Sequence, residues 1–257
     1  MVGEKSSAGV IKFLAWLGPA FTAMWLFGAG PVTHWTYILP PSAANSAATT
    51  LNTYLEHTVA IRVGCIFMIF ASVLYAFWGM SISMLSRRSE GSRPVLFYCQ
   101  VINLAACVVV VMFIGFFWGV AAFRPGETTP EITQALNDLG WFGVLFTGAP
   151  FAGYQWALAA SILRDKSDNP PFPRWSAFYN LFISMFMVEA SLILFFKTGP
   201  FSQNGALVFY APMIAFFTWI CLMSALTLKA VKTESGGTPP APGTNRLDAP
   251  KELSASV

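Results

Sequence analysis

Charged residues are scarce in this sequence: Asp, Glu, Lys and Arg make up 11% of 257 residues, and the formal net charge is only +3. A chain without a dense basic or acidic surface gives no reason to expect nucleic acid as a partner. Cysteines are also few. All four fall within apolar runs and lack metal-ligand spacing, so we expect them to be small buried side chains.

Several catalytic motifs are absent as well. The sequence contains no Walker lysine loop, no glycine-rich dinucleotide fingerprint and no nucleophile elbow around a serine, each of which needs a fixed pattern of residues. With two histidines, it also has no His-rich cluster of the kind a membrane metal oxygenase uses. We therefore expect neither a metal nor a cofactor.

Long apolar runs dominate what is present. Hydrophobic residues make up 55% of the chain, aromatic residues 16%. Runs near the ~20 residues that cross a bilayer recur along its whole length. The sequence predicts an all-α, multi-pass membrane protein, embedded in a lipid bilayer, with six transmembrane helices at 10–30, 59–85, 95–122, 140–163, 175–196 and 206–230.

The Lys and Arg residues predict an orientation. If the N-terminus is cytoplasmic, only Arg62, Arg124 and Lys197 of the fifteen Lys and Arg residues lie outside. This agrees with the positive-inside rule. Residues 233–257, rich in Gly, Pro, Ser and Thr, read as a disordered cytoplasmic tail after a six-helix domain at 1–232. We expect the protein to lie in a plasma membrane, with the inner membrane of a bacterium as the favoured case. Both termini are then cytoplasmic.

The spans also repeat one another. "FMIFASVLYAF" at 67–77 aligns without a gap with "FMVEASLILFF" at 186–196. "LAWLGPAFTA" from Leu14 likewise matches "LGWFGVLFTG" from Leu139, and "VLFYCQVI" from Val95 matches "LVFYAPMI" from Leu207. Chance similarity among Phe-rich and Leu-rich helices is the alternative to a duplication.

A duplicated unit of three helices enters the membrane from opposite sides in its two copies. The sequence therefore suggests a 3+3 inverted-topology repeat, with copies at about 10–122 and 140–230. Transporters and channels with this architecture place their sites near the midplane between the halves. The step from duplication to transport is an analogy of architecture.

Glu189 and Arg62 are the first candidate site residues. Glu189 replaces Phe70 of the aligned segment and is a lone acid in an apolar run. An acid within the bilayer needs a partner, a proton or an aqueous cavity. Arg62 lies near the same membrane boundary, so the two could line one outward-facing cavity. The alternative is that each only pins neighbouring helices together.

Other polar residues lie deeper. In "FTGAPFAGYQW", Pro150 removes a backbone hydrogen bond, and Tyr154 and Gln155 add polar groups near the middle of the membrane. A broken helix of this kind often contributes to a solute site, although an ordinary kink is the alternative. Asn103 is a further candidate for the pore, or a hydrogen-bonding link to a neighbouring helix.

His34 and His57 flank a long loop between the first two spans. Histidine titrates near neutral pH, so both are candidate pH sensors, with a solvated loop as the alternative. Their spacing with Glu56 gives no support for a metal site.

These features predict a channel or transporter for a small neutral or weakly acidic solute, with homo-oligomerisation as a further expectation. An enzyme is the less favoured interpretation. The alternatives are a membrane-embedded enzyme that acts on a lipid or other apolar substrate, with Glu189 as general acid, and a non-catalytic subunit of a membrane complex.

Overall fold

The computed structural model describes residues 2–236, which form helices and turns without a strand. The tail beyond residue 236 lies outside the described residues. The elements, in chain order, are α1 (Val2–Ala29), η1 (Pro31–Thr33), α2 (Ala47–Glu56), α3 (Thr58–Ser86), η2 (Arg87–Ser89), α4 (Val95–Ala121), α5 (Pro130–Leu145), α6 (Ala149–Arg164), α7 (Arg174–Glu189), η3 (Ala190–Leu194), η4 (Ala206–Tyr210) and α8 (Ala211–Gly236).

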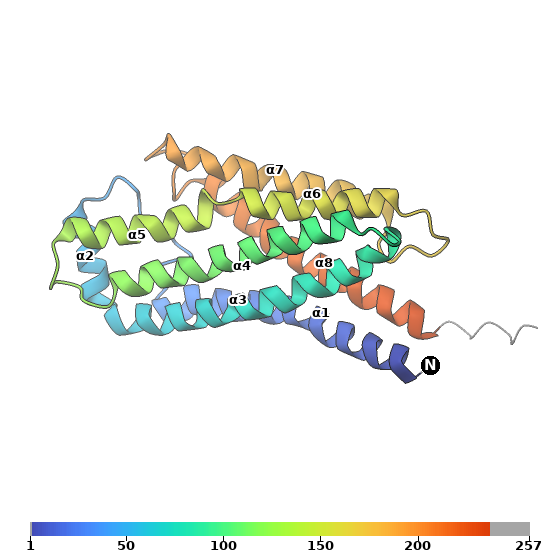
Figure 1. The fold of residues 1–257 in the computed structure, drawn as a ribbon. Coiled ribbons are helices and arrows are strands. Elements are labelled where there is room, and N and C mark those ends of the chain that lie inside the picture. Colours follow the sequence, from blue (N-terminus) through green and yellow to red (C-terminus); the bar gives the residue numbers. More distant parts are fainter. Residues whose placement is uncertain (1, 237–257) are drawn as a thin grey trace, which may run out of the picture.

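Five helical segments of the described chain are long and apolar enough to cross a membrane. They correspond to α1, α3, α4, α7 with the turn after it, and α8 with the turn before it. The prediction of an all-α chain is confirmed for the described residues, and these five segments are candidate membrane-spanning helices. In place of the span predicted at 140–163, two shorter helices, α5 and α6, lie end to end (Figure 1).

α5 begins ten residues before the predicted span, in a segment that was expected to be an outer loop. Thr129 is extended, Pro130 occupies the first turn and Glu131 follows it, which is a favourable start for a helix. The first turns are amphipathic, and Thr133 and Asn137 belong to the buried face. A search for continuous apolar runs misses such a helix.

The helix is interrupted between Leu145 and Ala149. Pro150 has no N–H to donate to the carbonyl four residues earlier. Just before it, the Thr147 hydroxyl donates a separate hydrogen bond to the Gly143 carbonyl, at 2.6 Å. A Cβ at Gly148 would collide with the Met187 backbone, so the interruption brings this segment directly against α7.

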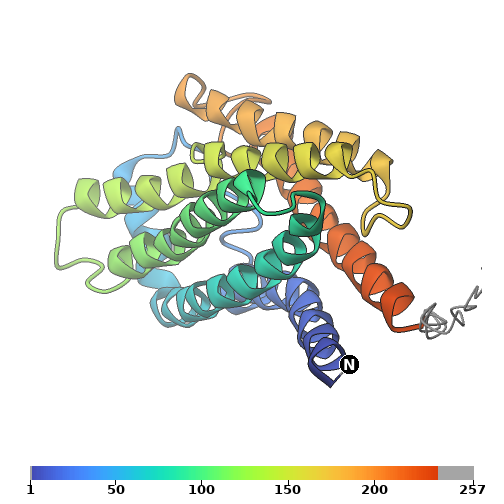
Figure 2. The same ribbon diagram turned by 45° about the vertical axis from the view of Figure 1, so that its right-hand side comes forward.

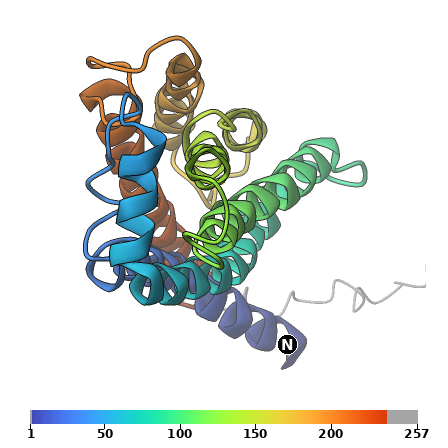
Figure 3. The ribbon, with the colours of Figure 1, turned by 90° about the vertical axis from the view of Figure 1, so that its left-hand side faces the viewer.

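The loop that was expected between the first two spans also contains a helix, α2. Its N-cap is Ser46, whose hydroxyl accepts a hydrogen bond from the Thr49 N–H at 3.2 Å, a common way for a helix to begin. α2 lies across one end of the bundle and packs against α5 and α3 (Figure 3).

The long helices run back and forth between two ends of the molecule. The start of α1 and the end of α8 lie at the same end (Figure 1, Figure 2). We call this the basic end, because the turns there carry Arg87, Arg93, Arg164, Lys166 and Arg174. The opposite end, which we call the α2 end, carries Arg62, Arg124 and Lys197.

Small residues allow the first two long helices to approach closely. A Cβ on Gly64 of α3 would lie 2.7 Å from the Gly28 carbonyl oxygen of α1, and would also collide with the Thr33 methyl group. Close backbone approach through small residues is the usual way for helices to associate in a membrane, where the hydrophobic effect no longer drives them together.

Indole hydrogen bonds link α8 to the rest of the bundle. Trp78 of α3 donates to the Ser224 hydroxyl at 2.8 Å, and Trp219 of α8 donates to the Asn180 side-chain oxygen of α7 at 2.8 Å. All four side chains are buried. Such bonds fix the rotation of each helix about its own axis, because a partner side chain must face each indole.

The Gly28–Gly64 crossing gives a direct test of the packing. We expect Gly64→Ala to destabilise the protein by about 1–3 kcal/mol, because the added methyl group overpacks the contact with α1. Thermal unfolding in detergent micelles measures the change. Gly9→Ala is the control, since no atom lies within 4 Å of a Cβ at that position. Equal stability of the two variants would contradict the close crossing.

Candidate functional site

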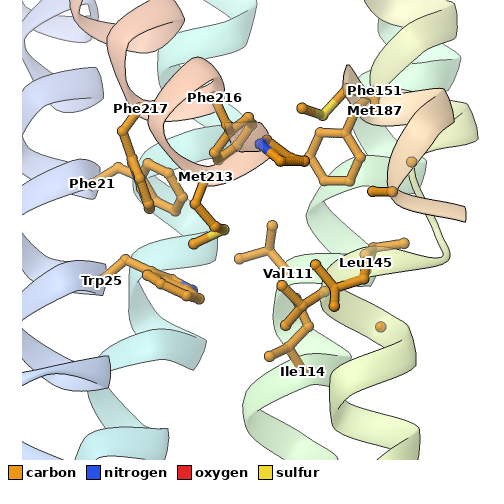
Figure 4. Close-up of a pocket in the computed structure, with 16 residues that line it drawn as sticks. Phe21, Trp25, Val111, Ile114, Leu145, Phe151, Met187, Met213, Phe216 and Phe217 are labelled. Atoms are coloured by element: carbon orange, nitrogen blue, oxygen red, sulfur yellow. The ribbon is translucent and has the colours of Figure 1, made fainter. Parts of the chain in front are cut away.

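A cavity lies in the middle of the bundle, beside the interruption between α5 and α6. Its volume is about 570 Å³, including its open mouth. Figure 4 shows α1 and α8 on one side of it and α4 to α7 on the other. The side chains that face one another across it are Phe21, Trp25, Met213, Phe216 and Phe217 on one side, and Val111, Ile114, Leu145, Phe151 and Met187 on the other.

The cavity wall consists of aromatic, aliphatic, methionine, glycine and proline residues, without a charged side chain. Rings pack edge to face along it: the Phe151 and Phe216 ring centroids are 5.5 Å apart at 87°. Pockets for small molecules are mostly apolar with a few polar groups. This wall suits an uncharged molecule with an apolar body, because a charge would lose its hydration without gaining a partner.

Unpartnered polar atoms belong to residues that lie close to wall residues of this cavity, although none of them is itself part of the wall. Among the described residues, the buried side-chain nitrogen and oxygen atoms without a hydrogen bond belong to Thr22, Tyr75, Trp141 and Gln155. Thr22 follows the wall residue Phe21, and the Tyr75 ring lies 5.1 Å from the Phe21 ring. Trp141 is one helical turn before Leu145, and Gln155 is one turn after Phe151. Buried polar groups are normally paired, so their concentration here calls for an explanation.

Four aromatic residues pack against one another on the α2 side of the cavity. The Tyr37 ring stacks on Trp118 with centroids 3.7 Å apart, and Trp141 contacts Trp118 and Phe209 at 5.0 and 5.8 Å. Trp118, Trp141 and Phe209 each lie one helical turn beyond residues of the cavity wall. We call Tyr37, Trp118, Trp141 and Phe209 the aromatic cluster.

Hydrogen bonds hold Tyr37 in place from outside the bundle. Its hydroxyl lies 3.1 Å from that of Tyr54 in α2, and the Tyr54 hydroxyl donates to Asn137 of α5 at 3.2 Å. Burial raises the pKa of both tyrosines well above the usual value, and each phenol stays protonated at physiological pH. α2 therefore acts as a support for the aromatic cluster.

Polar side chains fill the bundle between the cavity and the basic end. The Tyr154 hydroxyl of α6 donates to the Gly79 carbonyl of α3 at 2.9 Å and lies 3.2 Å from the Ser83 hydroxyl. One turn further, the Gln100 amide accepts from Ser86 at 3.0 Å and donates to Ser161 at 3.1 Å. These bonds join α3, α4 and α6.

A smaller hollow lies next to these hydrogen bonds, nearer the basic end of the bundle. Its lining includes Ser86, Ser161 and Asp165, together with Pro171 and Phe172 of the linker between α6 and α7. A row of hydrogen-bonding groups therefore leads from the cavity to the basic end. These groups bond to one another, so the row is packed with side chains and is not an open passage.

Arg62, a predicted site residue, caps a helix. Its Nε donates to the Ala122 carbonyl at 2.8 Å and its Nη2 donates to the Phe123 carbonyl at 2.7 Å. Both carbonyls follow the last residue of α4, where a cation also interacts favourably with the helix dipole. The guanidinium is exposed and lies outside the cavity wall.

Glu189 is the last residue of α7 and is partly buried. No hydrogen bond or ion pair to its carboxylate is found among the described residues. Its neighbours Met187 and Ala190 line the cavity, whereas Glu189 does not. α3 and α7 lie on opposite sides of the bundle (Figure 3), so the structure does not bring Arg62 and Glu189 together.

The remaining predicted residues lie in two regions. Tyr154 and Gln155 are both fully buried on α6, near the cavity. Asn103 of α4 donates to its own helix, at the Cys99 carbonyl (2.9 Å), and a Cβ on Gly153 would crowd its side chain. It lies where α4 and α6 approach closely.

His34 and His57 meet at the α2 end and are not part of the cavity wall. Their rings stack with centroids 5.1 Å apart, and the His57 Nε2 lies 3.9 Å from a Glu56 carboxylate oxygen. His34 and Trp35 both have positive φ, 52° and 66°, an unusual conformation for aromatic residues. No group of three metal-ligating side chains occurs in the described part of the chain.

The arrangement predicts that Arg62 and Glu189 act independently. We expect Arg62→Gln to lower stability by about 1 kcal/mol, through loss of the α4 cap. Combined with Glu189→Gln, its effect should be additive within about 0.5 kcal/mol. Thermal unfolding of the single and double variants measures this. A coupling above about 1 kcal/mol would instead support an ion pair.

Comparisons with known proteins do not indicate a function, so the interpretation depends on the geometry described above. No protein-family model, curated protein or solved structure matches the chain. The apolar cavity, the unpartnered polar atoms close to its wall, and the aromatic cluster and hydrogen bonds on its two sides are therefore the observations from which a function is inferred.

Proposed function

We propose that this protein is a membrane transporter or channel for a small neutral or weakly acidic solute with a largely apolar body, which binds in the central cavity. The observation that carries the proposal is the apolar cavity beside a discontinuous helix, with unpartnered polar groups close to its wall residues. Transporters commonly bind their substrates at interrupted helices near the bilayer midplane.

The direction of the helices supports six crossings. α1, α3 and α4 alternate between the basic end and the α2 end, and α7 and α8 do the same (Figure 1). The pair α5 and α6 runs from the α2 end to the basic end, so together it supplies the remaining crossing. Large exposed side chains such as Phe70, Phe113 and Phe182 fit contact with lipid.

Burial at matched positions supports the inverted repeat in two of its three helix pairs. Met68 and Met187 are both buried, as are Phe97 and Phe209, while Ile102 and Ile214 are both exposed. The pair formed by α1 and α5–α6 differs: Trp16 is exposed and its counterpart Trp141 is fully buried. In this reading the two copies have diverged most where the helix is broken.

The cavity lies where the two proposed copies meet. α1 and α4 of the first copy and α5 to α8 of the second contribute to its wall. The basic end then faces the cytoplasm by the positive-inside rule, so both termini are cytoplasmic in a plasma membrane. The aromatic cluster closes the outer exit and the Tyr154 and Gln100 hydrogen bonds close the inner one.

The alternative of a lipid-modifying enzyme is less well supported. General acid–base or nucleophilic chemistry needs a titratable or nucleophilic group beside the substrate, whereas the cavity wall supplies none. Glu189, the predicted general acid, lies outside that wall. Transport needs only binding and a change of access.

Filling the cavity tests the proposal. Val111 of α4 lines it, and Val109 on the same helix is 45% exposed. We expect Val111→Phe to reduce solute flux at least about tenfold, equivalent to roughly 1.4 kcal/mol, while Val109→Phe retains it. Uptake of radiolabelled lactate and benzoate into proteoliposomes measures flux, with empty liposomes as the baseline.

Two results would contradict transport through this cavity. One is wild-type uptake equal to that of empty liposomes for every solute. The other is undiminished uptake by Val111→Phe, provided that thermal unfolding shows both variants to be folded.

A further inference from the structure

Two buried glutamines differ in one respect. Gln100 of α4 and Gln155 of α6 both have side chains that are fully inaccessible to solvent. The Gln100 amide uses its oxygen and its nitrogen in hydrogen bonds to serines. Neither Gln155 amide atom has a hydrogen-bond partner among the described residues. The hydrogen-bonding groups of the glutamine side chain are therefore paired at position 100 and unpaired at position 155.

An unsatisfied amide is unfavourable in a closed apolar bundle. It has given up its hydrogen bonds to water and has gained none from the protein. A leucine of similar size would pack at such a position without that loss. The glutamine at 155 therefore contributes nothing evident to the stability of this conformation, which points to a partner that is not part of the chain.

The position of Gln155 indicates where such a partner would lie. It follows Phe151, a wall residue, by one helical turn, and long helical side chains lean toward the preceding turn. The Phe151 ring lies 6.1 Å from that of Tyr75, whose buried hydroxyl has the weakly hydrogen-bonding Cys107 thiol beside it and no nitrogen or oxygen partner among the described residues. Two hydrogen-bonding groups thus lie behind one aromatic side chain of the cavity.

We propose that Gln155, assisted by Tyr75, binds the polar group of the transported solute. This rests on the proposed function and specifies its substrate class. The solute has an apolar body, held between the aromatic walls, and one uncharged hydrogen-bonding group such as a hydroxyl or a protonated carboxyl. Rotation of the Phe151 ring joins the amide to the cavity. The apolar wall accepts the body, and the amide and phenol discriminate the polar group.

A pair of isosteric probes tests this proposal. Para-fluorophenol carries a hydroxyl where para-fluorotoluene carries a methyl group, and fluorine NMR reports the binding of each to the purified protein in lipid nanodiscs. We expect the wild type to bind para-fluorophenol more tightly than para-fluorotoluene, after the partitioning of each probe into empty nanodiscs has been subtracted. Gln155→Leu should reduce this preference about tenfold, equivalent to roughly 1.4 kcal/mol, while still binding para-fluorotoluene.

Gln100→Leu is the matched control. It removes a buried glutamine that the protein itself satisfies, so it should lower thermal stability and leave the probe preference unchanged. If Gln100→Leu does not fold, Asn103→Leu replaces it, because that amide bonds only within its own helix among the described residues. Gln155→Leu should unfold at the same temperature as the wild type or higher.

The outcomes separate the two proposals. Equal probe preference in the wild type and Gln155→Leu overturns the role of Gln155 and leaves the cavity as a binding site. Destabilisation of Gln155→Leu to the extent seen for Gln100→Leu also overturns it, since the amide would then be structural. Failure of the wild type to bind either probe overturns this inference, whereas the proposed function is judged by solute flux.

Discussion

The absence of water inside a membrane-embedded bundle constrains most of what is described above. Each polar group that enters such a bundle must find its partner in the protein or in a ligand. The indoles of Trp78 and Trp219, the Tyr154 hydroxyl and the Gln100 amide obey this rule. Because these bonds link different helices, they also set the orientation of α3, α4, α6, α7 and α8 around the centre.

The same constraint gives meaning to the exceptions. Unpartnered atoms could be scattered through a bundle of this size, but here they belong to residues close to the wall residues of one cavity. Aromatic stacking lies on the α2 side of the cavity and hydrogen bonds lie on its basic side. The packing on the two sides relies on different forces, so a change in hydration at the basic end would act on one side and leave the other intact.

Local sequence patterns predicted the helices that are uniformly apolar. The ends of α3 and α4 lie within a residue of those predicted, because apolar runs end there at the charged or proline-containing turns near Arg87, Pro94 and Arg124. The first half of α5 and the whole of α2 were not predicted. α5 has a polar first half, and α2 is short and begins with a capping serine rather than an apolar run.

The candidate site was predictable only in part. Tyr154 and Gln155 drew attention as polar residues after a proline, and both lie near the cavity. The residues of the cavity wall could not be predicted, since a Phe or Met that faces a cavity looks the same in sequence as one that faces lipid. Arg62 was misleading for the opposite reason: a charge in an apolar run stands out, but only the fold shows that it meets the end of α4.

The contact between Gly148 and the Met187 backbone has a consequence for the shape of the cavity wall. The junction of α5 and α6 meets α7 there with no side chain between the two backbones. Gly148 and Met187 both line the cavity. Any residue larger than glycine at position 148 would force the junction and α7 apart, and would change the size of the binding space without altering one of its bulky wall residues.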